Sequence, residues 1–243
     1  MKDELYHLIV GILDLFLWSG ELVGEDNLPR RGPAVFVANH LNATGPIAAV
    51  CSIPLRVHSW TVADMVDQEK AAAYLKWDFV ERSLHIQPPL SAWVARRLAK
   101  PASAFLRGLG CIPVYKGDYD RMVETLRLSM DELRQDHFLL VFPEDNMLPE
   151  DPQTRMKPFQ HSFVRLGEMY YAETRARLDF YPVAVHSAGC VIIGKPVTFN
   201  PLNPVGIERH RLKDLMECTV RDMYLNVDHE PGREVAGLTP QHK

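Results

Sequence analysis

The chain has 243 residues, of which 47% are hydrophobic and 24% are charged, and its formal net charge is −4 at pH 7. This length and composition are typical of one globular domain that buries a sizeable core. The slightly acidic balance excludes the broad basic surface that collects nucleic-acid phosphates. We therefore expect no nucleic-acid partner, and only a local site for any anion.

An apolar stretch, Leu5 to Trp18, lies within a predicted N-terminal amphipathic helix over residues 1–24. His7 and Asp14 interrupt the stretch, and it is shorter than the roughly 20 residues that a membrane-spanning helix needs. Its apolar residues recur at helical spacing, so one face can either lie among lipid headgroups or pack on the body of the protein. Both interpretations of residues 5–18, a membrane surface contact and an internal contact, stay open at this point.

The start of the chain and its cysteines bear on the cellular compartment. Lys2 is followed at once by two acidic residues, and no small-residue cleavage site closes the apolar stretch, which argues against a cleavable signal. The four cysteines lie far apart, without a Cys-x-x-Cys pair or the spacing of a zinc site, so we expect buried free thiols. These features favour a cytoplasmic protein, with peripheral attachment to the cytoplasmic face of a membrane as the alternative.

Residues 25–230 are predicted to form the main domain. Its first strand, AVFVANH at 34–40, is a short β-rich run that ends in polar residues. Two helices follow at 68–84 and 90–109, and Pro101 is expected to kink or divide the second.

Short apolar strands and helices alternate along the rest of the domain. We predict strands at 110–115, 137–142, 179–186 and 190–199, and helices at 120–135, 163–175 and 209–227. The last of these strands contains the turn Gly194-Lys195-Pro196. The alternation predicts an α/β fold with a central, mostly parallel or mixed sheet flanked by helices. The polar tail at 231–243 is expected to be mobile.

Four sequence blocks occur along the domain in a definite order. They are VANHLNATGP at 37–46, LGCIPVYKG at 109–117, LVFPED at 140–145, and YPVAV at 181–185 with GKPV at 194–197. In this order they resemble the motifs of the PlsC-type glycerolipid acyltransferases, the superfamily that includes lysophosphatidic acid and glycerol-3-phosphate acyltransferases. The resemblance covers roughly residues 28–201 and implies the fold of that superfamily.

For His40, in the first block, the resemblance implies the role of general base. The imidazole would remove the proton from an acceptor hydroxyl, which then attacks the thioester of acyl-CoA or acyl carrier protein. Imidazole suits this work because its pKa lies near neutrality. Asn39 and Asn42 of the same block are taken as substrate-binding residues. The implied partners are the acyl thioester donor and a lipid or small-molecule acceptor, with no cofactor beyond that co-substrate.

Gly45 is the largest departure from the family pattern, because the family places there an aspartate that orients the histidine. Replacing the orienting aspartate of a serine-protease triad lowers turnover by roughly 10⁴-fold. We therefore expect His40 to be a weak base unless another group orients its ring. The groups considered for this role are Glu144, Asp64, Asp145, Asn42 and Thr44. Of these, Glu144 is taken as the second catalytic residue.

The second and third blocks, which the resemblance assigns to the acceptor's phosphate, also depart from the pattern. Lys116 replaces arginine and keeps the charge but loses the planar fork that grips a phosphate. Pro143 is retained, while Asp145, Asn146 and Met147 stand where the family has Gly, Thr and Arg, which adds a negative charge and removes a positive one. We keep Lys116, Pro143, Asp145 and Asn146 as substrate-binding candidates and expect an acceptor without phosphate, such as an amine or a sugar hydroxyl. A simple polar turn is the alternative for Asp145 and Asn146.

A basic run precedes the second block and is interleaved with apolar side chains. Its members are Arg96, Arg97, Lys100 and Arg107, with Trp93, Leu98 and Phe105. Such a face can meet anionic headgroups or the phosphates of coenzyme A, but a solvated helix face is the commoner case. The other histidines show no metal-ligand spacing, so we expect no metal site and assign them structural or surface roles. They include His58, His85, His137, His161, His186 and His210.

The preferred interpretation is an acyltransferase that moves a fatty-acyl group from a thioester to a hydroxyl or amine acceptor. A noncatalytic module that binds an acyl chain or lysolipid is the main alternative, and the loss of the aspartate at Gly45 motivates it. A hydrolase that passes the acyl group to water needs the same His40 and is the third interpretation.

Overall fold

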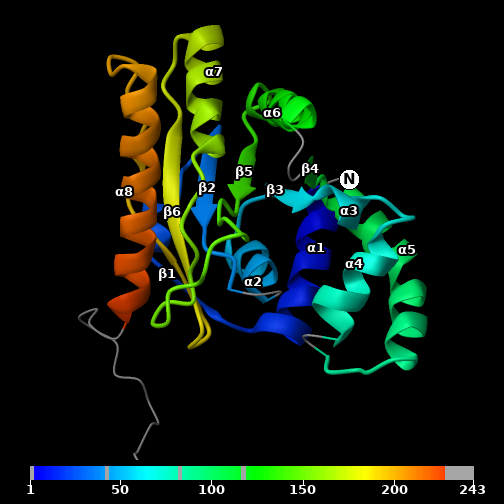
Figure 1. Ribbon diagram of the computed structural model, residues 1–243. Helices are drawn as coiled ribbons and strands as arrows, with labels where there is room; N and C mark the ends of the chain where they lie inside the picture. Colours follow the sequence, from blue (N-terminus) through cyan, green and yellow to red (C-terminus); the bar gives the residue numbers. More distant parts are fainter. Residues whose placement is uncertain (1–2, 42–43, 82–83, 116–118, 228–243) are drawn as a thin grey trace, which may run out of the picture.

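A computed structural model describes residues 3–41, 44–81, 84–115 and 119–227. The tail at 231–243 and two substrate-binding candidates, Asn42 and Lys116, lie outside these residues. A mixed sheet runs through the centre of the molecule, and helices cover its faces (Figure 1). The predicted α/β class, with a mostly parallel or mixed sheet flanked by helices, is confirmed.

The sheet has the strand order β1-β7-β6-β2-β5-β3-β4, and β8 pairs with β6 beside this path. The strands are β1 (Glu21–Val23), β2 (Ala34–Ala38), β3 (Val57–Val62), β4 (Ile112–Val114), β5 (Phe138–Val141), β6 (Asp179–His186), β7 (Cys190–Ile193) and β8 (Val197–Thr198). β2 pairs in parallel with both β5 and β6, β3 with β5 and β4, and β1 with β7. β6 is antiparallel to β7 and β8. The ends of β2, β3, β4, β5 and β6 therefore point to one edge of the sheet.

Helices lie along both faces of the sheet and beside it. The α-helices are α1 (Asp3–Leu13), α2 (Thr44–Ser52), α3 (Ala63–Val66), α4 (Ala71–Leu75), α5 (Leu90–Leu109), α6 (Tyr119–Leu133), α7 (Arg165–Thr174) and α8 (Val205–Leu225). Two segments of π-helix, Asp14–Trp18 and Lys76–Glu81, continue α1 and α4. α6, α7 and α8 pack on one face of the sheet, and α2 packs on the other. α4 and α5 enclose a smaller core of their own.

β2 is the central strand of the parallel part, and all five of its side chains are buried. Apolar side chains alternate between the two faces, so that Val35 and Val37 join the core under α6, α7 and α8, while Phe36 joins the core under α2. A strand buried on both faces reads as a continuous apolar run, which is why this element was predictable. Its rigid placement carries the polar residues that follow it.

The elements that were not predicted include β1, α2 and β3. β1 has only three residues, too few for a periodic signal. α2 contains Pro46, but in its first turn, where the missing amide costs no helical bond. In β3, His58 and Ser59 are polar yet buried, so the strand lacks the expected apolar pattern.

A kink or a division was expected at Pro101; α5 is one continuous helix with Pro101 inside it, so the division is wrong. The strand predicted at 190–199 is two strands, β7 and β8, separated at the turn over 194–196.

The N-terminal helix α1 docks on the protein through the side opposite to most of its apolar residues. Tyr6 and Val10 are buried against Leu109 and its neighbours. The outward side of α1 and of the π-helix that continues it exposes five large apolar side chains, which are Leu5, Leu8, Ile12, Leu15 and Phe16. No helix in the described part of the chain is long and apolar enough to cross a membrane. The helix thus packs on the body through one side and presents an apolar surface with the other.

The four cysteines are free thiols, as expected, but they are not all buried. Cys190 is buried, whereas Cys218 is exposed, so the expectation of burial is wrong for Cys218. Burial raises the pKa of Cys51 and of Cys111 to about 11. Both thiols are therefore protonated and unreactive at neutral pH.

Candidate functional site

The site is built on the polar residues that follow β2, beginning with Asn39. Asn39 is 1% exposed, and its side-chain amide spans to β6: Nδ2 donates to the Val185 carbonyl oxygen at 3.0 Å, and Oδ1 accepts from the Val185 amide at 2.7 Å. These paired bonds continue the β2–β6 ladder beyond the end of the strand. Asn39, a substrate-binding candidate, anchors the main chain that carries His40.

His40 lies at the carboxyl edge of the parallel strands and is half-buried. Its main-chain amide donates to Glu144 Oε1 at 2.9 Å. Its ring meets the ring of Phe142 edge-on, with centroids 5.4 Å apart and an interplanar angle of 75°. Phe142 and Glu144 both follow β5, the neighbour of β2, so the first and third sequence blocks meet at this edge.

Glu144 was expected to act on the His40 ring, but the bond seen at Glu144 is made to the main-chain amide of His40. Burial raises the pKa of Glu144, and hydrogen bonds from the backbone amides of His40 and Lys157 oppose that shift. Its main chain forms an antiparallel bridge with Phe159. Glu144 therefore ties the loop after β5 to the chain after β2.

Gly45 lies directly against the main chain of His40. A Cβ atom added at Gly45 would stand 2.6 Å from both the carbonyl carbon and the carbonyl oxygen of His40, and the Gly45 amide donates to the Leu41 carbonyl oxygen at 3.1 Å. Real Cβ atoms do not approach backbone this closely, so this loop conformation admits only glycine. The missing aspartate is thus matched by a local backbone path that has no room for one.

The residues after Glu144 form a tight turn. Asp145 Oδ1 accepts from the Met147 amide at 3.0 Å, and the Leu148 amide donates to the Asp145 carbonyl oxygen at 3.1 Å. Asn146 is exposed, and its Oδ1 accepts from Lys157 Nζ at 3.4 Å. Pro143 is buried, and its carbonyl oxygen accepts from the Gln160 amide at 2.8 Å. These contacts match the polar-turn alternative for Asp145 and Asn146.

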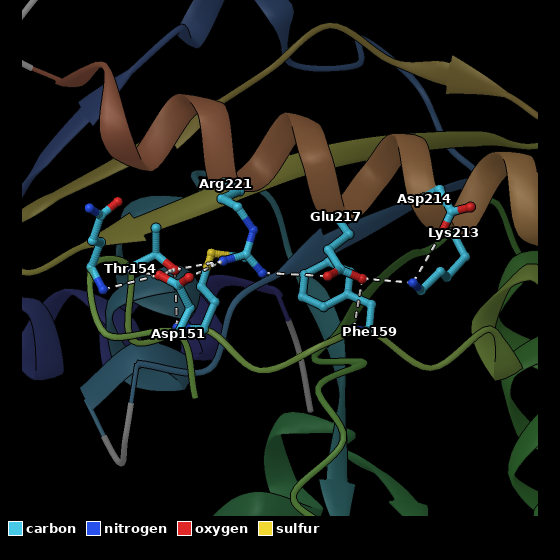
Figure 2. Close-up of polar contacts among 9 residues, drawn as sticks. Asp151, Thr154, Phe159, Lys213, Asp214, Glu217 and Arg221 are labelled. Atoms are coloured by element: carbon cyan, nitrogen blue, oxygen red, sulfur yellow. Dashed lines mark hydrogen bonds and ion pairs between the residues drawn. The ribbon is translucent and has the colours of Figure 1, made fainter. Parts of the chain in front are cut away.

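Helix α8 braces the long loop that follows this turn (Figure 2). Glu217 Oε2 accepts from the Phe159 amide at 2.9 Å, and the Arg221 guanidinium donates to Thr154 Oγ1 at 3.1 Å and lies 3.4 Å from Asp151 Oδ2. Lys213 Nζ lies 2.8 Å from Glu217 Oε2 and supports that carboxylate. Because Phe159 bridges Glu144, the brace connects α8 to the main chain of His40 through the loop.

A cavity of about 300 Å³ opens at the same edge of the sheet, past the ends of β3 and β4. Its charged lining is Asp64, Lys70 and Arg121, and Tyr74 and Tyr115 add two aromatic rings. Lys70 Nζ lies 3.7 Å from Asp64 Oδ1, and the Arg121 guanidinium lies 3.6 Å from the centre of the Tyr115 ring. Asp64, which was considered as an orienting group for His40, thus pairs with Lys70. Two cations facing a cavity suit an anionic group of a ligand.

Sequence reasoning missed Lys70, Tyr74 and Arg121 because none of them lies in a recognisable block. Lys70 and Tyr74 belong to the segment around α4, and Arg121 to the first turn of α6. Only the pairing of β3 with β4 brings these segments together. No motif in the sequence therefore pointed to these three residues as neighbours.

The basic run on α5 is exposed, as a solvated helix face would be. Arg96, Arg97, Lys100 and Arg107 all face solvent. Trp93 is 54% exposed, and the Arg97 guanidinium lies 5.4 Å from its ring centre. The run thus forms a mixed basic and aromatic surface on the helical unit beside the sheet.

Comparison with solved structures identifies a protein of similar fold, whereas comparisons of the sequence do not. No protein-family model matches the sequence, and no curated protein matches it. Among solved structures, the chain is similar to PlsC, the 1-acyl-sn-glycerophosphate (LPA) acyltransferase of Thermotoga maritima, with a TM-score of 0.53 and 13% sequence identity. The match covers 95% of this chain and 84% of that one. This likeness confirms the PlsC-like acyltransferase fold that the four sequence blocks predict, and at such low identity it concerns the fold alone.

Proposed function

Since the chain has the PlsC-like acyltransferase fold, we propose that it is an acyltransferase that moves a fatty-acyl group from an acyl thioester to a hydroxyl or amine acceptor. The observation that carries the proposal is the placement of His40. A half-buried imidazole follows the central parallel strand, at the edge where ligands of open α/β sheets bind, and Glu144 and Asn39 hold its main chain in place.

The proposed reaction uses His40 first as a base and then as an acid. The imidazole takes the proton of the acceptor O–H or N–H, and the acceptor atom forms a bond to the thioester carbonyl carbon. The carbon–sulfur bond then breaks, and the departing thiolate takes the proton from the imidazolium. Acyl carrier protein or coenzyme A leaves as the free thiol, and the acceptor carries the acyl group.

The orientation of the His40 ring distinguishes this chain from enzymes that carry the motif aspartate. The edge-on contact with Phe142 restricts the ring, and the Glu144 bond fixes the main chain beneath it. Gly45 supplies no carboxylate in the place of the motif aspartate, so we expect turnover to be slower than in enzymes that carry it. Glu144 acts in this proposal as a positioning residue.

The surroundings of His40 suggest where the two substrates bind. Lys70 and Arg121 in the neighbouring cavity suit an anionic portion of the donor or acceptor. The apolar outward side of α1 and the basic surface of α5 favour binding to the cytoplasmic face of a membrane, where lipid acceptors and acyl chains are concentrated. We therefore propose a peripheral membrane enzyme of lipid metabolism.

The direct test is acyl transfer by the full-length chain. Long-chain acyl-CoA is incubated with purified protein and a panel of acceptors: lysophosphatidic acid, glycerol 3-phosphate, a long-chain amine and a sugar. Thiol release and acylated product are both measured. We expect acylation of at least one acceptor, and a loss of roughly 10²- to 10⁴-fold in His40→Ala. His161→Ala removes an exposed histidine elsewhere and is the matched control. Equal product from wild type and His40→Ala would overturn the proposed mechanism.

A noncatalytic binding module is the second candidate, and the backbone path at Gly45 favours it, because no aspartate fits there. In that case acyl-CoA binds equally to wild type and His40→Ala, and neither protein releases thiol. The hydrolase interpretation gives a third pattern in the same assay. Thiol and free fatty acid then appear without any acceptor, and the release depends on His40.

A further inference from the structure

A second cluster of titratable side chains lies at the opposite, amino-terminal edge of the parallel strands. His58 is the second residue of β3, His137 directly precedes β5, and Glu132 is in the last turn of α6. β3 and β5 are paired so that His58 stands opposite Leu139, which brings the two histidines together. One nitrogen or oxygen from each of the three side chains lies within 4.8 Å of those of the other two.

The ring of His58 is oriented by a backbone carbonyl. Nδ1 lies 3.1 Å from the Gly110 carbonyl oxygen, so Nδ1 carries a proton and donates it. Gly110 has a φ of +79°, and a Cβ there would stand 2.8 Å from His58 Nδ1, so only glycine allows this contact. With the proton on Nδ1, a neutral ring presents a bare lone pair at Nε2.

The surroundings of this lone pair, on Nε2 of His58, are buried. His58 is 3% exposed, and its Nε2 makes no hydrogen bond to any residue that the structure describes. Glu132 Oε2 lies 3.5 Å from Nε2, so one acceptor faces another without a positive group between them. A buried polar atom in this state is costly unless a cation occupies the gap.

His137 completes the arrangement from the solvent side. Its Nδ1 lies 2.7 Å from the same Glu132 Oε2. The rings of His58 and His137 are stacked, with centroids 5.0 Å apart and an interplanar angle of 9°. Two stacked imidazolium rings would repel each other, whereas two neutral imidazoles and one carboxylate are the protonation states that metal ligation requires.

We propose that His58, Glu132 and His137 bind a divalent transition-metal ion of the zinc class. Two imidazoles and a carboxylate are a typical zinc donor set. The Gly110 carbonyl supplies the outer hydrogen bond that metal-binding histidines usually make. Ligand atoms of a tetrahedral zinc site lie about 3.3 Å apart, given bonds of about 2.0 Å. In the structure the three ligand atoms lie within 4.8 Å of one another, so metal binding would require the side chains to adjust to that spacing.

The metal would serve the fold and not the acyl chemistry, because it lies at the edge of the sheet opposite to His40. Glu132 and His137 are 25% and 38% exposed, which leaves a fourth position open to water. The nearby guanidinium of Arg56 is paired with Asp3 at 2.6 Å, so its charge is partly neutralised. The bound ion would tie together β3, the end of α6 and the start of β5, and through Gly110 the turn after α5.

The test uses the full-length, tag-free chain after removal of metal by a chelator. Co²⁺ is titrated in, and the ligand-field absorption of a tetrahedral site is recorded; Zn²⁺ is then tested for competition and for a rise in the thermal midpoint. We expect one equivalent of Co²⁺ with an intense tetrahedral spectrum, displaced by Zn²⁺. Glu132→Gln and His137→Ala should each weaken binding by more than the roughly 100-fold that outer-shell substitutions reach.

Both substituted residues are partly exposed, so the variants should fold, and circular dichroism of the metal-free proteins checks this. His210→Ala is the matched control, because His210 also belongs to a stacked histidine pair, with His161, centroids 6.2 Å apart. Stoichiometric binding that is lost in the two ligand variants and kept in the control supports the site. Weak or substoichiometric uptake, or uptake that Glu132→Gln and His137→Ala leave unchanged, would overturn it.

Discussion

His40 at the carboxyl edge of the sheet and His58 at the amino edge are held in different ways. His40 is half-buried, and the bonds that fix it act through Glu144 and Asn39 on its main chain. His58 is buried, and the bond that fixes it acts on its ring through the Gly110 carbonyl oxygen. The first arrangement suits a group that exchanges protons with a ligand, and the second suits a group that keeps one lone pair aimed at one place. Both residues are histidines, so residue type does not distinguish the two roles. What distinguishes them is whether the hydrogen bonds hold the main chain or the ring.

The largest expected effect is the difference in the free energy of unfolding between two variants, His58→Ala and His40→Ala. His58→Ala removes a buried ring and leaves the Gly110 carbonyl oxygen without its donor, so we expect a loss of about 3 kcal/mol in the free energy of unfolding. His40→Ala should change it by less than about 1 kcal/mol, because the main-chain bond to Glu144 survives the substitution. Urea unfolding of both metal-free variants measures this difference. Similar losses in the two proteins would contradict the contrast between the edges.

Gly45→Ala tests the backbone path beside His40 and ranks second. The added methyl group would stand 2.6 Å from the His40 carbonyl group, so the loop must shift, at a cost of about 2 kcal/mol. Gly45→Asp carries the same Cβ and should be destabilised as well, without a gain in acyl transfer. Chemical unfolding and the acyl-CoA assay, run on both variants, check this. Higher activity in Gly45→Asp would mean that the loop adapts and that the missing carboxylate alone limits the rate.

Glu144 gives the smallest effect and a defined pH dependence. Glu144→Ala removes the acceptor of the His40 amide, but it also removes the cost of burying a carboxylate, so we expect a net loss of about 1 kcal/mol. Glu144→Gln keeps an acceptor oxygen and carries no charge. It should therefore unfold at a higher temperature than the wild type at pH 7.

The raised pKa of Glu144 in the native protein determines whether its contribution to stability rises or falls with pH. The native state holds the Glu144 proton more tightly than the unfolded state does, so this group stabilises the fold most at low pH, and the contribution declines as the pH rises through the native pKa. The advantage of Glu144→Gln should thus shrink as the pH is lowered towards the ordinary glutamate value of 4.5. Thermal unfolding of the wild type and of Glu144→Gln from pH 4 to pH 8 measures the difference between their unfolding temperatures. A difference that grows on acidification would show that burial does not dominate the pKa of Glu144.

The sequence predicted the carboxyl edge far better than the amino edge. β2 and α5 were recognisable because a continuous apolar run and a helical period ending at Gly110 are local signals. The meeting of the first and third blocks was implied by parallel strands whose ends share an edge. The hydrogen bonds between Asn39 and Val185 were not predicted, because Val185 lies 146 residues away and only the β2–β6 pairing brings it close.

The amino edge had no comparable local signal. Glu132 and His137 are five residues apart, but His58 lies in a strand whose polar residues hid it from a periodicity search. The register of β3 against β5 decides whether the three side chains meet, and register depends on the assembled sheet. Histidine spacing along the chain, from which we expected no metal site, is therefore a poor guide to which histidines become neighbours.

The brace from α8 has a consequence for how the protein is made. The main chain at His40 is held by Glu144, Glu144 is bridged to Phe159, and the Phe159 amide is held by Glu217 near the end of the described chain. A ribosome therefore delivers the first block long before the group that locks it. Until α8 has emerged and docked, the main chain at His40 lacks the support that Glu217 gives to it through Phe159 and Glu144.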